Sequence, residues 1–271
     1  MHAMREIYQR ITMQKDQGVS NITIIKEAQI YGAIKTRLLQ RKNAYWIRKT
    51  HIFDIFSGDG MNIVDGEVVW GSPIETLYAI IHSGISRYSF IASDIRSDAV
   101  ERLEQRMGDL GKHTDTKFQT VDAASQIKHI RELMRNHPSN HTLVIIDPNG
   151  PGVMPFKEMR VLSQIYSKRV DIFLNISETA INRILRCGIT KNKNWWAEYE
   201  SFSSIILDIF KHYKQAWVRK VIIGDRQKWR FICFWSYAPT KSGWDKQGLI
   251  SVPSKQEMEE ILKGAGNVSN A

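Results

Sequence analysis

Two short segments of the sequence carry the residue types of a ligand-binding loop and of a reaction site. The first, Asp54-Ile55-Phe56-Ser57-Gly58-Asp59-Gly60, is an apolar run that breaks into a turn with two glycines. Glycine lets a backbone approach a ligand closely and adopt positive φ. The second, Ile145-Ile146-Asp147-Pro148-Asn149-Gly150, is an apolar run that breaks into a polar turn. Their order predicts a cofactor-binding loop, with Ser57, Gly58 and Gly60 against the cofactor, followed by a loop that orients an acceptor.

Three aspartates are expected on the same rim as the glycine turn. Asp94 and Asp122 each follow a predicted strand, and the carboxyl ends of parallel strands meet at one edge of a sheet. Asp94 is placed to accept from two ribose hydroxyls and Asp122 from an adenine amino group, while Asp54 either orients the loop or accepts from a methionine amino group. The glycine turn and the later polar turn, in this order, resemble the cofactor and catalytic loops of S-adenosylmethionine-dependent methyltransferases, so S-adenosylmethionine is the expected cofactor. The alternative for Asp94 and Asp122 is a helix N-cap or a solvated loop residue, and it fits Asp122 better.

The polar turn after the later strand resembles the acceptor loop of amino-group methyltransferases that act on nucleic acids. In their Asp/Asn-Pro-Pro-aromatic loop, the polar side chain accepts from the target amine and the aromatic ring stacks on the extruded base. Asp147, Pro148 and Asn149 are the corresponding catalytic candidates, with Asn149 replacing the second proline and Gly150 the aromatic residue. The stacking ring would then come from another segment: Phe156, Trp195 or Trp196. The alternative is an ordinary turn in which proline presets φ.

The elements that must position these residues alternate between strand and helix, which predicts a parallel sheet covered on both faces. The predicted strands are His51–Phe56, Tyr88–Ala92, Lys117–Val121, Leu143–Ile146 and Val170–Ile176. The predicted helices are Ser72–Ser83, Ser97–Met107, Ala124–Asn136, Glu178–Arg186 and Phe202–Tyr213. Ser72 is expected to cap the first helix in a capping box with Glu75.

The last part of the chain changes pattern. Ala216–Ile223 and Trp229–Tyr237 predict an antiparallel hairpin. Five parallel strands, a helix and a terminal hairpin follow the order of class I methyltransferase folds. The predicted fold is therefore α/β and Rossmann-like, with a mostly parallel seven-stranded sheet, a C-terminal antiparallel hairpin and an N-terminal helical extension. The expected boundaries are 1–49 for the basic extension, 50–240 for the methyltransferase-like domain and 241–271 for a tail.

These motifs resemble the three-Cys-motif partner protein family, a methyltransferase-like group found in bacteria and their phages. The resemblance is carried by the glycine turn, the Asp147 turn and three further segments: Gly71-Ser72-Pro73, the strand from Asp171 to Ser177, and Trp229-Arg230-Phe231. It implies the class I fold and S-adenosylmethionine, and leaves the substrate open. The family usually has Ala-Gly-Pro-Gly where this chain has Ser57-Gly58-Asp59-Gly60. That departure places an acidic residue beside the expected methionine site.

Charge and aromatic content favour a polyanionic partner. The chain has 38 Lys+Arg against 28 Asp+Glu and a formal net charge of +10, which favours contact with nucleic-acid phosphates. Lys193, Trp195 and Trp196 combine a cation with two indoles, which suits phosphate neutralisation and base stacking; burial under the sheet edge is the alternative. Asn175 ends the fifth strand on the same rim and is a substrate-binding candidate, with a helix cap as its alternative. A protein partner for target recognition is also compatible with the sequence.

The remaining composition narrows the class of protein. Cys187 and Cys233 match neither a disulfide framework nor metal-ligand spacing, so we expect a reduced, cytoplasmic compartment and no metal site. No secretory signal and no apolar run of membrane-spanning length is evident in the sequence.

Two functions remain open at this point. The first is an S-adenosylmethionine-dependent methyltransferase that acts on an amino nitrogen of a DNA or RNA base. The second is a catalytically degenerate methyltransferase-like subunit that binds nucleic acid or protein, which Asp59 and Gly150 favour because both depart from the motifs. A Rossmann-like enzyme with another nucleotide ranks last, because the glycine turn is not G-x-G-x-x-G and no Walker-type lysine follows it.

Overall fold

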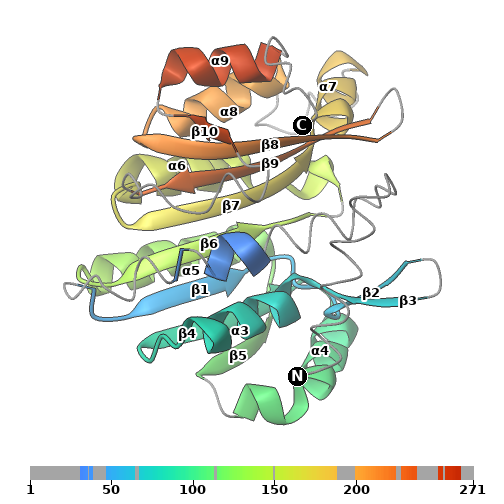
Figure 1. Ribbon diagram of the computed structural model, residues 1–271, viewed down its shortest axis with the longest axis vertical. Coiled ribbons are helices and arrows are strands. Elements are labelled where there is room, and N and C mark those ends of the chain that lie inside the picture. The colour runs from blue at the N-terminus through green and yellow to red at the C-terminus, as the bar shows by residue number, and fades with distance from the viewer. Residues whose placement is uncertain are drawn as a thin grey trace.

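The chain alternates strands and helices around one central sheet, as the computed structural model shows (Figure 1). The structure describes residues 31–35, 37–38, 47–64, 67–112, 115–148, 150–187, 199–223, 227–236, 250–252 and 254–263. Within these ranges the sheet has eight strands in the order β10-β8-β9-β7-β6-β1-β4-β5. Their bounds are β1 Thr50–Asp54, β4 Tyr88–Asp94, β5 Thr116–Thr120, β6 His141–Ile146, β7 Val170–Ser177, β8 Gln215–Ile223, β9 Gln227–Trp235 and β10 Ile250–Val252.

The strand order reverses beside β1, at the centre of the sheet. β4 and β5 continue in parallel on one side of β1, and β6 and β7 continue in parallel on the other. β9 pairs antiparallel with β7, and β8 pairs antiparallel with β9. The five predicted parallel strands and the two strands of the terminal hairpin are therefore confirmed, and β10 adds an antiparallel strand at the edge. Such a reversal opens a crevice outside the carboxyl ends of the two central strands.

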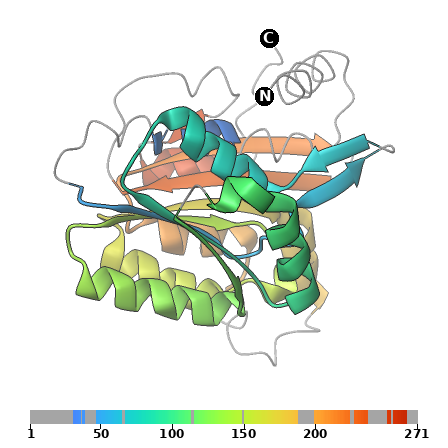
Figure 2. The same cartoon turned by 90° about the horizontal axis from the view of Figure 1, so that it is seen from below.

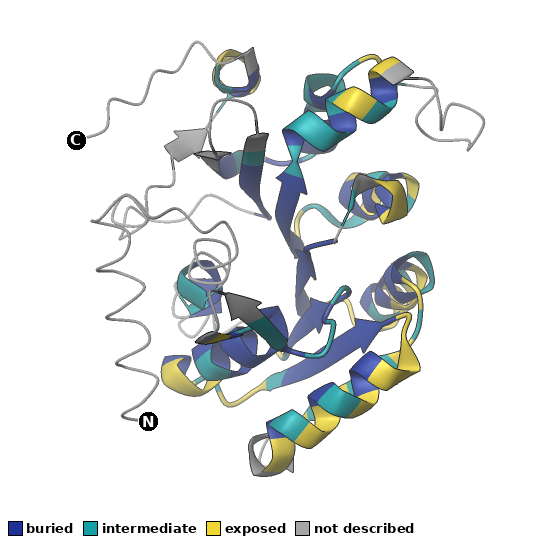
Figure 3. Cartoon of the chain, turned by 90° about the vertical axis from the view of Figure 1, so that its right-hand side faces the viewer, coloured by how far each residue is buried: buried dark blue, intermediate teal, exposed yellow. Residues whose placement is uncertain are grey.

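Helices cover both faces of the sheet, and each face has its own apolar core (Figures 2 and 3). One face carries α5 Ala123–Asn136, α6 Phe156–Tyr166, α7 Glu178–Cys187, α8 Phe202–Phe210 and α9 Lys255–Lys263. The other carries α3 Ser72–Ser83, α4 Ser97–Lys112 and the helical residues 31–35 and 37–38. In α5 the buried residues Ile127, Ile130 and Met134 recur at helical spacing, so one stripe faces the sheet. No described helix is long and apolar enough to cross a membrane.

Several elements were not predicted from the sequence. β2 (Met61–Val64) and β3 (Glu67–Trp70) form a separate hairpin between the glycine turn and α3. The short 3-10 helix η1 (Pro151–Val153) and α6 follow the Asp147 turn. The predicted capping box is wrong, because Gly71 occupies the N-cap of α3 and no side chain hydrogen-bonds there. Ser72 is already inside the helix. The cap residue lies so close to the Gly60 backbone that a side chain at position 71 would collide with it, so glycine occupies the cap.

A buried ion pair ties the N-terminal helix to the amino-terminal ends of β6 and β7. Arg37 Nε donates to Asp171 Oδ2 at 2.5 Å and Arg37 Nη2 donates to Oδ1 at 3.1 Å, with both side chains fully buried. The guanidinium lies over the Trp235 ring, 4.4 Å from its centroid. The Ser236 amide donates to Asp171 Oδ1 at 2.6 Å, and His141 Nε2 lies 3.2 Å from Oδ2. The described part of the predicted helical extension therefore packs directly on the sheet.

Candidate active site

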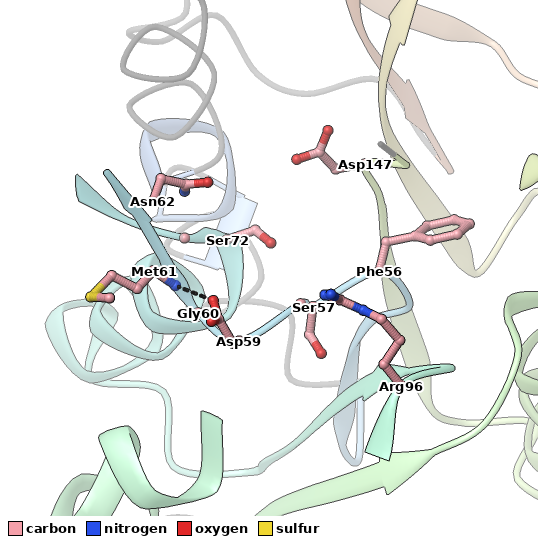
Figure 4. Close-up of a pocket in the computed structure, with 11 residues that line it drawn as sticks. Phe56, Ser57, Asp59, Gly60, Met61, Asn62, Ser72, Arg96 and Asp147 are labelled. Carbon is pink, nitrogen blue, oxygen red and sulfur yellow. Dashed lines mark hydrogen bonds between the residues drawn. The ribbon is translucent and has the colours of Figure 1, made fainter. Parts of the chain in front are cut away.

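A cleft opens where the strand order reverses, between the carboxyl ends of β1 and β6 (Figure 4). Its volume is about 170 Å³. The glycine turn, the first residues of β2 and α3, Arg96 after β4 and Asp147 after β6 line it. Ligands of open α/β sheets bind at this position. The two segments that the sequence singles out therefore meet in one cleft.

The glycine turn has a backbone shape that other residues adopt only with strain. Gly58 has φ +56° and Gly60 has φ +74°, both in the left-handed region. A Cβ on Gly60 would lie 2.5 Å from Leu103 Cδ1, and a Cβ on Gly71 would lie 3.0 Å from the Gly60 backbone carbon. The Gly71 amide donates to the Gly60 carbonyl at 2.8 Å. This approach brings the start of α3 against the turn although the β2–β3 hairpin separates them in the sequence.

Asp54 and Asp94 support the turn from two neighbouring strands. Asp94 Oδ2 accepts from the Gly58 amide at 3.0 Å, and Oδ1 accepts from the Arg96 amide at 3.0 Å. Asp54 Oδ1 accepts from the Phe56 amide at 3.3 Å, and its side chain is fully buried. Neither aspartate is among the residues that line the cleft. A carboxylate oxygen has two lone pairs, so Asp94 retains the capacity to accept from a ligand while it supports the turn.

Asp59 brings a negative charge to the cleft, and two arginines of α4 lie against it. Arg106 Nη1 is 2.9 Å from Asp59 Oδ2, and Arg102 Nε is 3.4 Å from the same oxygen. Partial burial acts to raise the pKa of Asp59, but hydrogen bonds from Arg106, the Met61 amide and Arg102 outweigh it and hold the pKa below its ordinary value. Asp59 is therefore ionised near neutral pH, with its charge offset by two cations.

Asp147 and Asn175 come together from adjacent parallel strands. Asn175 Nδ2 donates to Asp147 Oδ1 at 2.9 Å, and both side chains are buried. Asp147 also lines the cleft, and the next residue, Pro148, is buried. The amide donor fixes the direction of the carboxylate. The structure thus joins two residues that the sequence placed on one rim without predicting their contact.

Asp122 lies away from the cleft lining and caps α5. Its Oδ1 accepts from the Ser125 amide at 2.9 Å, and its Oδ2 accepts from the Ser125 hydroxyl at 2.6 Å. These hydrogen bonds hold the pKa of Asp122 below its ordinary value. The helix cap is the alternative that the sequence already offered. The other predicted site residues lie outside the described residues: Asn149, Lys193, Trp195 and Trp196.

Several residues of the cleft carry no sequence prediction. Met61, Asn62 and Arg96 line it, and Ser72 lines it instead of capping α3. Arg96 could have been predicted from the sequence, because it lies two residues after an aspartate at a strand end. Asn62 was not, because its position depends on the unpredicted hairpin. Among the described residues, no three His, Cys, Asp or Glu side chains are grouped as a metal site.

Comparison with known proteins bears on the fold. No protein-family model and no curated protein matches the chain. The crystal structure of protein LPL1258 from Legionella pneumophila is similar with a TM-score of 0.50 and 13% identity, over 87% of this chain and 91% of that chain. The human methyltransferase 10 domain containing protein is similar with a TM-score of 0.40 and 9% identity, over 78% and 82% of the two chains. The plantazolicin methyltransferase BamL in complex with SAH is similar with a TM-score of 0.43 and 7% identity, over 84% and 91%.

The strand order decides the fold class. Five parallel strands are followed by an antiparallel hairpin whose second strand, β9, lies between β7 and β8. The chain has a class I methyltransferase fold. Because the similarity to solved structures extends only to the fold, the chemistry of the cleft rests on its own residues.

Proposed function

We propose that this protein is an S-adenosylmethionine-dependent methyltransferase that acts on an amino nitrogen of a nucleic-acid base, in DNA or RNA. One observation carries the proposal: the glycine turn after β1 and Asp147 after β6 line the same cleft at the strand-order reversal. One loop allows close backbone contact with a cofactor, and the other presents a carboxylate to an acceptor. Holding two reactants side by side in this way is the main requirement for transfer between them.

The residues around the cleft fit the proposed cofactor. Those that would hold it are Asp54, Ser57, Gly58, Gly60 and Asp94. Asp122, the sixth contact expected from the sequence, is left out of this set because both of its carboxylate oxygens accept from Ser125 in the cap of α5. The Ser57 hydroxyl supports this assignment, since it is buried at the cleft wall and has no hydrogen-bond partner among the described residues. A buried hydroxyl without a partner is costly, and a polar ligand atom would satisfy it. Ile95, directly after Asp94 and 71% exposed, offers an apolar surface to a flat ring.

Asp147 would orient the acceptor. Its carboxylate can accept from an amine N–H, and Asn175 holds that carboxylate in place. Pro148 and Asn149 would complete the loop. When bound, S-adenosylmethionine would supply a methyl group on a sulfonium: the nitrogen lone pair forms the new bond, sulfur keeps the electron pair of the broken bond, and the acceptor nitrogen gives up one proton to water. The protein's contribution is then mostly the positioning of the acceptor.

The net charge of +10 supports a nucleic-acid substrate, because phosphate neutralisation favours basic proteins. The proposed contacts to the nucleic acid remain Lys193, Trp195 and Trp196. A protein partner for target recognition is compatible with these contacts. In this proposal the aromatic ring absent at Gly150 comes from elsewhere in the chain.

A binding subunit without transfer chemistry is the second candidate, because Asp59 lines the cleft. Its carboxylate would lie near the carboxylate of a bound methionine group, and like charges disfavour each other. The ion pairs with Arg102 and Arg106 offset this charge, which favours the enzyme.

Transfer of a labelled methyl group from S-adenosylmethionine to DNA and RNA tests the proposal. We expect label in the nucleic acid and an N-methylated nucleoside after digestion. Binding of nucleic acid without transfer to either polymer would favour the binding subunit instead.

A further inference from the structure

The β2–β3 hairpin places a second polar side chain opposite Asp147. Asn62 is the second residue of β2 and lines the cleft together with Asp147. Figure 4 shows the two side chains on facing walls and pointing toward one another, with the Ser72 hydroxyl between them. Asn62 reaches this position only because the hairpin is inserted between the glycine turn and α3.

Backbone contacts at the base of the β2–β3 hairpin hold Asn62 on the face that is turned toward the protein. The Gly71 amide donates to the Gly60 carbonyl at 2.8 Å, which closes the hairpin at its root. Asn62 pairs with Val69 across the hairpin, and Val69 is buried. Cross-strand partners share one face of a hairpin, so the face that carries Asn62 is the one turned toward the protein. Val68, on the opposite face, is 43% exposed.

We propose that Asn62 and Asp147 together select the acceptor. The acceptor is an exocyclic amine on an aromatic ring, with an unprotonated ring nitrogen beside it. This inference rests on the proposed function. A carboxylate only accepts hydrogen bonds, so Asp147 takes an N–H of the exocyclic amine. The Asn62 amide group can donate to the neighbouring ring nitrogen. The two side chains then read a donor and an adjacent acceptor on the edge of an extruded base.

Adenine and cytosine present this donor–acceptor pair, and the other bases do not. Guanine presents its exocyclic amine beside a ring N–H, so both positions donate. Thymine and uracil carry no exocyclic amine. An aliphatic amine can donate a hydrogen bond to Asp147, but it has no adjacent ring nitrogen to accept one from the Asn62 amide. Ser72 both donates and accepts, so its hydroxyl does not discriminate among the bases.

The experiment uses oligothymidine strands that carry a single dA, dC or dG, the unsubstituted strand, and matching oligouridine strands. Methyl transfer from labelled S-adenosylmethionine is measured on each. We expect transfer to the adenine or cytosine strand and none to the guanine or unsubstituted strand. Asn62→Ala should lower kcat/KM about 10- to 100-fold, because one hydrogen bond of the pair is lost. Asn62→Asp replaces a donor with an acceptor and should move the preference toward the dG strand.

Val68→Ala is the matched control, since it changes the same hairpin on the face turned away from the cleft. It should leave kcat/KM unchanged, and retained affinity for S-adenosylhomocysteine in every variant shows an intact fold. Equal kcat/KM for Asn62→Ala and Val68→Ala, or wild-type transfer to guanine, would overturn the selection role and leave the methyltransferase in place. Cofactor binding without transfer to any strand would overturn the nucleic-acid substrate and this inference with it.

Discussion

The two ends of the central sheet use buried polar side chains in opposite ways. At the amino-terminal ends of β6 and β7, Asp171 is fully buried against the Arg37 guanidinium and the Ser236 amide. At the carboxyl-terminal ends of the same strands, Asp147 is also buried, but it lines a cleft and meets the neutral amide of Asn175. The enclosed carboxylate of Asp171 joins the N-terminal helix to the sheet. A carboxylate that lines a cleft lies where it can accept a hydrogen bond from a ligand.

The difference shows that burial alone does not identify a functional aspartate. Asp171 and Asp147 lie near opposite ends of neighbouring strands, and both are nearly inaccessible to solvent. The contacts among the described residues separate them: Asp171 meets the Arg37 guanidinium in an enclosed site, and Asp147 meets the Asn175 amide beside a cavity. Substitution at the two ends should therefore affect different properties of the protein.

The largest expected effect is on activity, at the carboxyl-terminal end. Asp147→Ala should lower kcat/KM for methyl transfer by roughly 10²- to 10⁴-fold, since the group that orients the acceptor is lost. The affinity for S-adenosylhomocysteine should stay at the wild-type value, as measured by calorimetric titration. Asp122→Ala is the matched control away from the cleft. Turnover retained by Asp147→Ala would remove Asp147 from the proposed mechanism.

The next effect is on stability, at the amino-terminal end. Asp171→Ala leaves Arg37 buried without its counter-charge and should lower the free energy of unfolding in urea by roughly 3–5 kcal/mol. The exposed pair between Lys49 and Asp115, with 2.6 Å between Nζ and Oδ2, provides the control. Lys49→Ala should cost less than about 1 kcal/mol. Equal losses for the two variants would break the contrast between a structural and a functional end of the sheet.

A buried histidine sharpens the same contrast through pH. His51, at the amino-terminal end of β1, lies 2.6 Å from Ser89 Oγ through Nδ1. Burial, reinforced by the charge of Lys49, lowers the pKa of His51 to about 4 from 6.5. Between these values the unfolded chain binds the proton and the folded chain does not, so stability falls as pH drops through this window. The loss should reach roughly 3 kcal/mol, and a His51→Gln variant should lack this component.

Urea unfolding across that window measures the effect, and an NMR titration of the imidazole locates the pKa directly. A measured His51 pKa near the ordinary value of 6.5 would contradict the conclusion that burial at the amino-terminal end of the sheet keeps this imidazole neutral.

The smallest expected effect concerns an aspartate at the carboxyl-terminal end that lies away from the cleft. Asp122→Ala removes the cap of α5 and should lower the free energy of unfolding by about 1 kcal/mol at neutral pH. Because hydrogen bonds from Ser125 lower the pKa of Asp122, the contribution is present above its ordinary value and is lost as pH falls through the folded value. The difference between wild type and variant should therefore vanish in acid. A difference that persists in acid would contradict the cap.

Much of the fold followed from the sequence because its strands are apolar runs and its helices have regular stripes. The buried residues of β1 and β6 illustrate the first, and the stripe of α5 illustrates the second. The β2–β3 hairpin escaped prediction, since two four-residue strands beside a glycine turn resemble a loop. The cap of α3 was predicted wrongly because the contact between Gly60 and Gly71 bridges that hairpin.

The site was predictable where it depends on strand ends, and not where it depends on distant contacts. The glycine turn and Asp147 follow from the rule that ligands bind at the carboxyl ends of parallel strands. Asn62 required the hairpin, and the ion pair between Arg37 and Asp171 joins residues 134 positions apart. No local pattern encodes such a pairing.

The most direct test of the central claim is calorimetric titration of the wild-type protein, Asp94→Ala and Asp122→Ala with S-adenosylhomocysteine. Both substitutions remove an aspartate at the end of a neighbouring strand, but only Asp94 hydrogen-bonds the glycine turn. We expect the wild-type protein to bind S-adenosylhomocysteine. Asp94→Ala should bind it at least about tenfold more weakly, because the charged acceptor of the Gly58 amide is lost. Asp122→Ala should lose less affinity. No binding by the wild-type protein, or equal losses in the two variants, would contradict a cofactor site at the strand-order reversal.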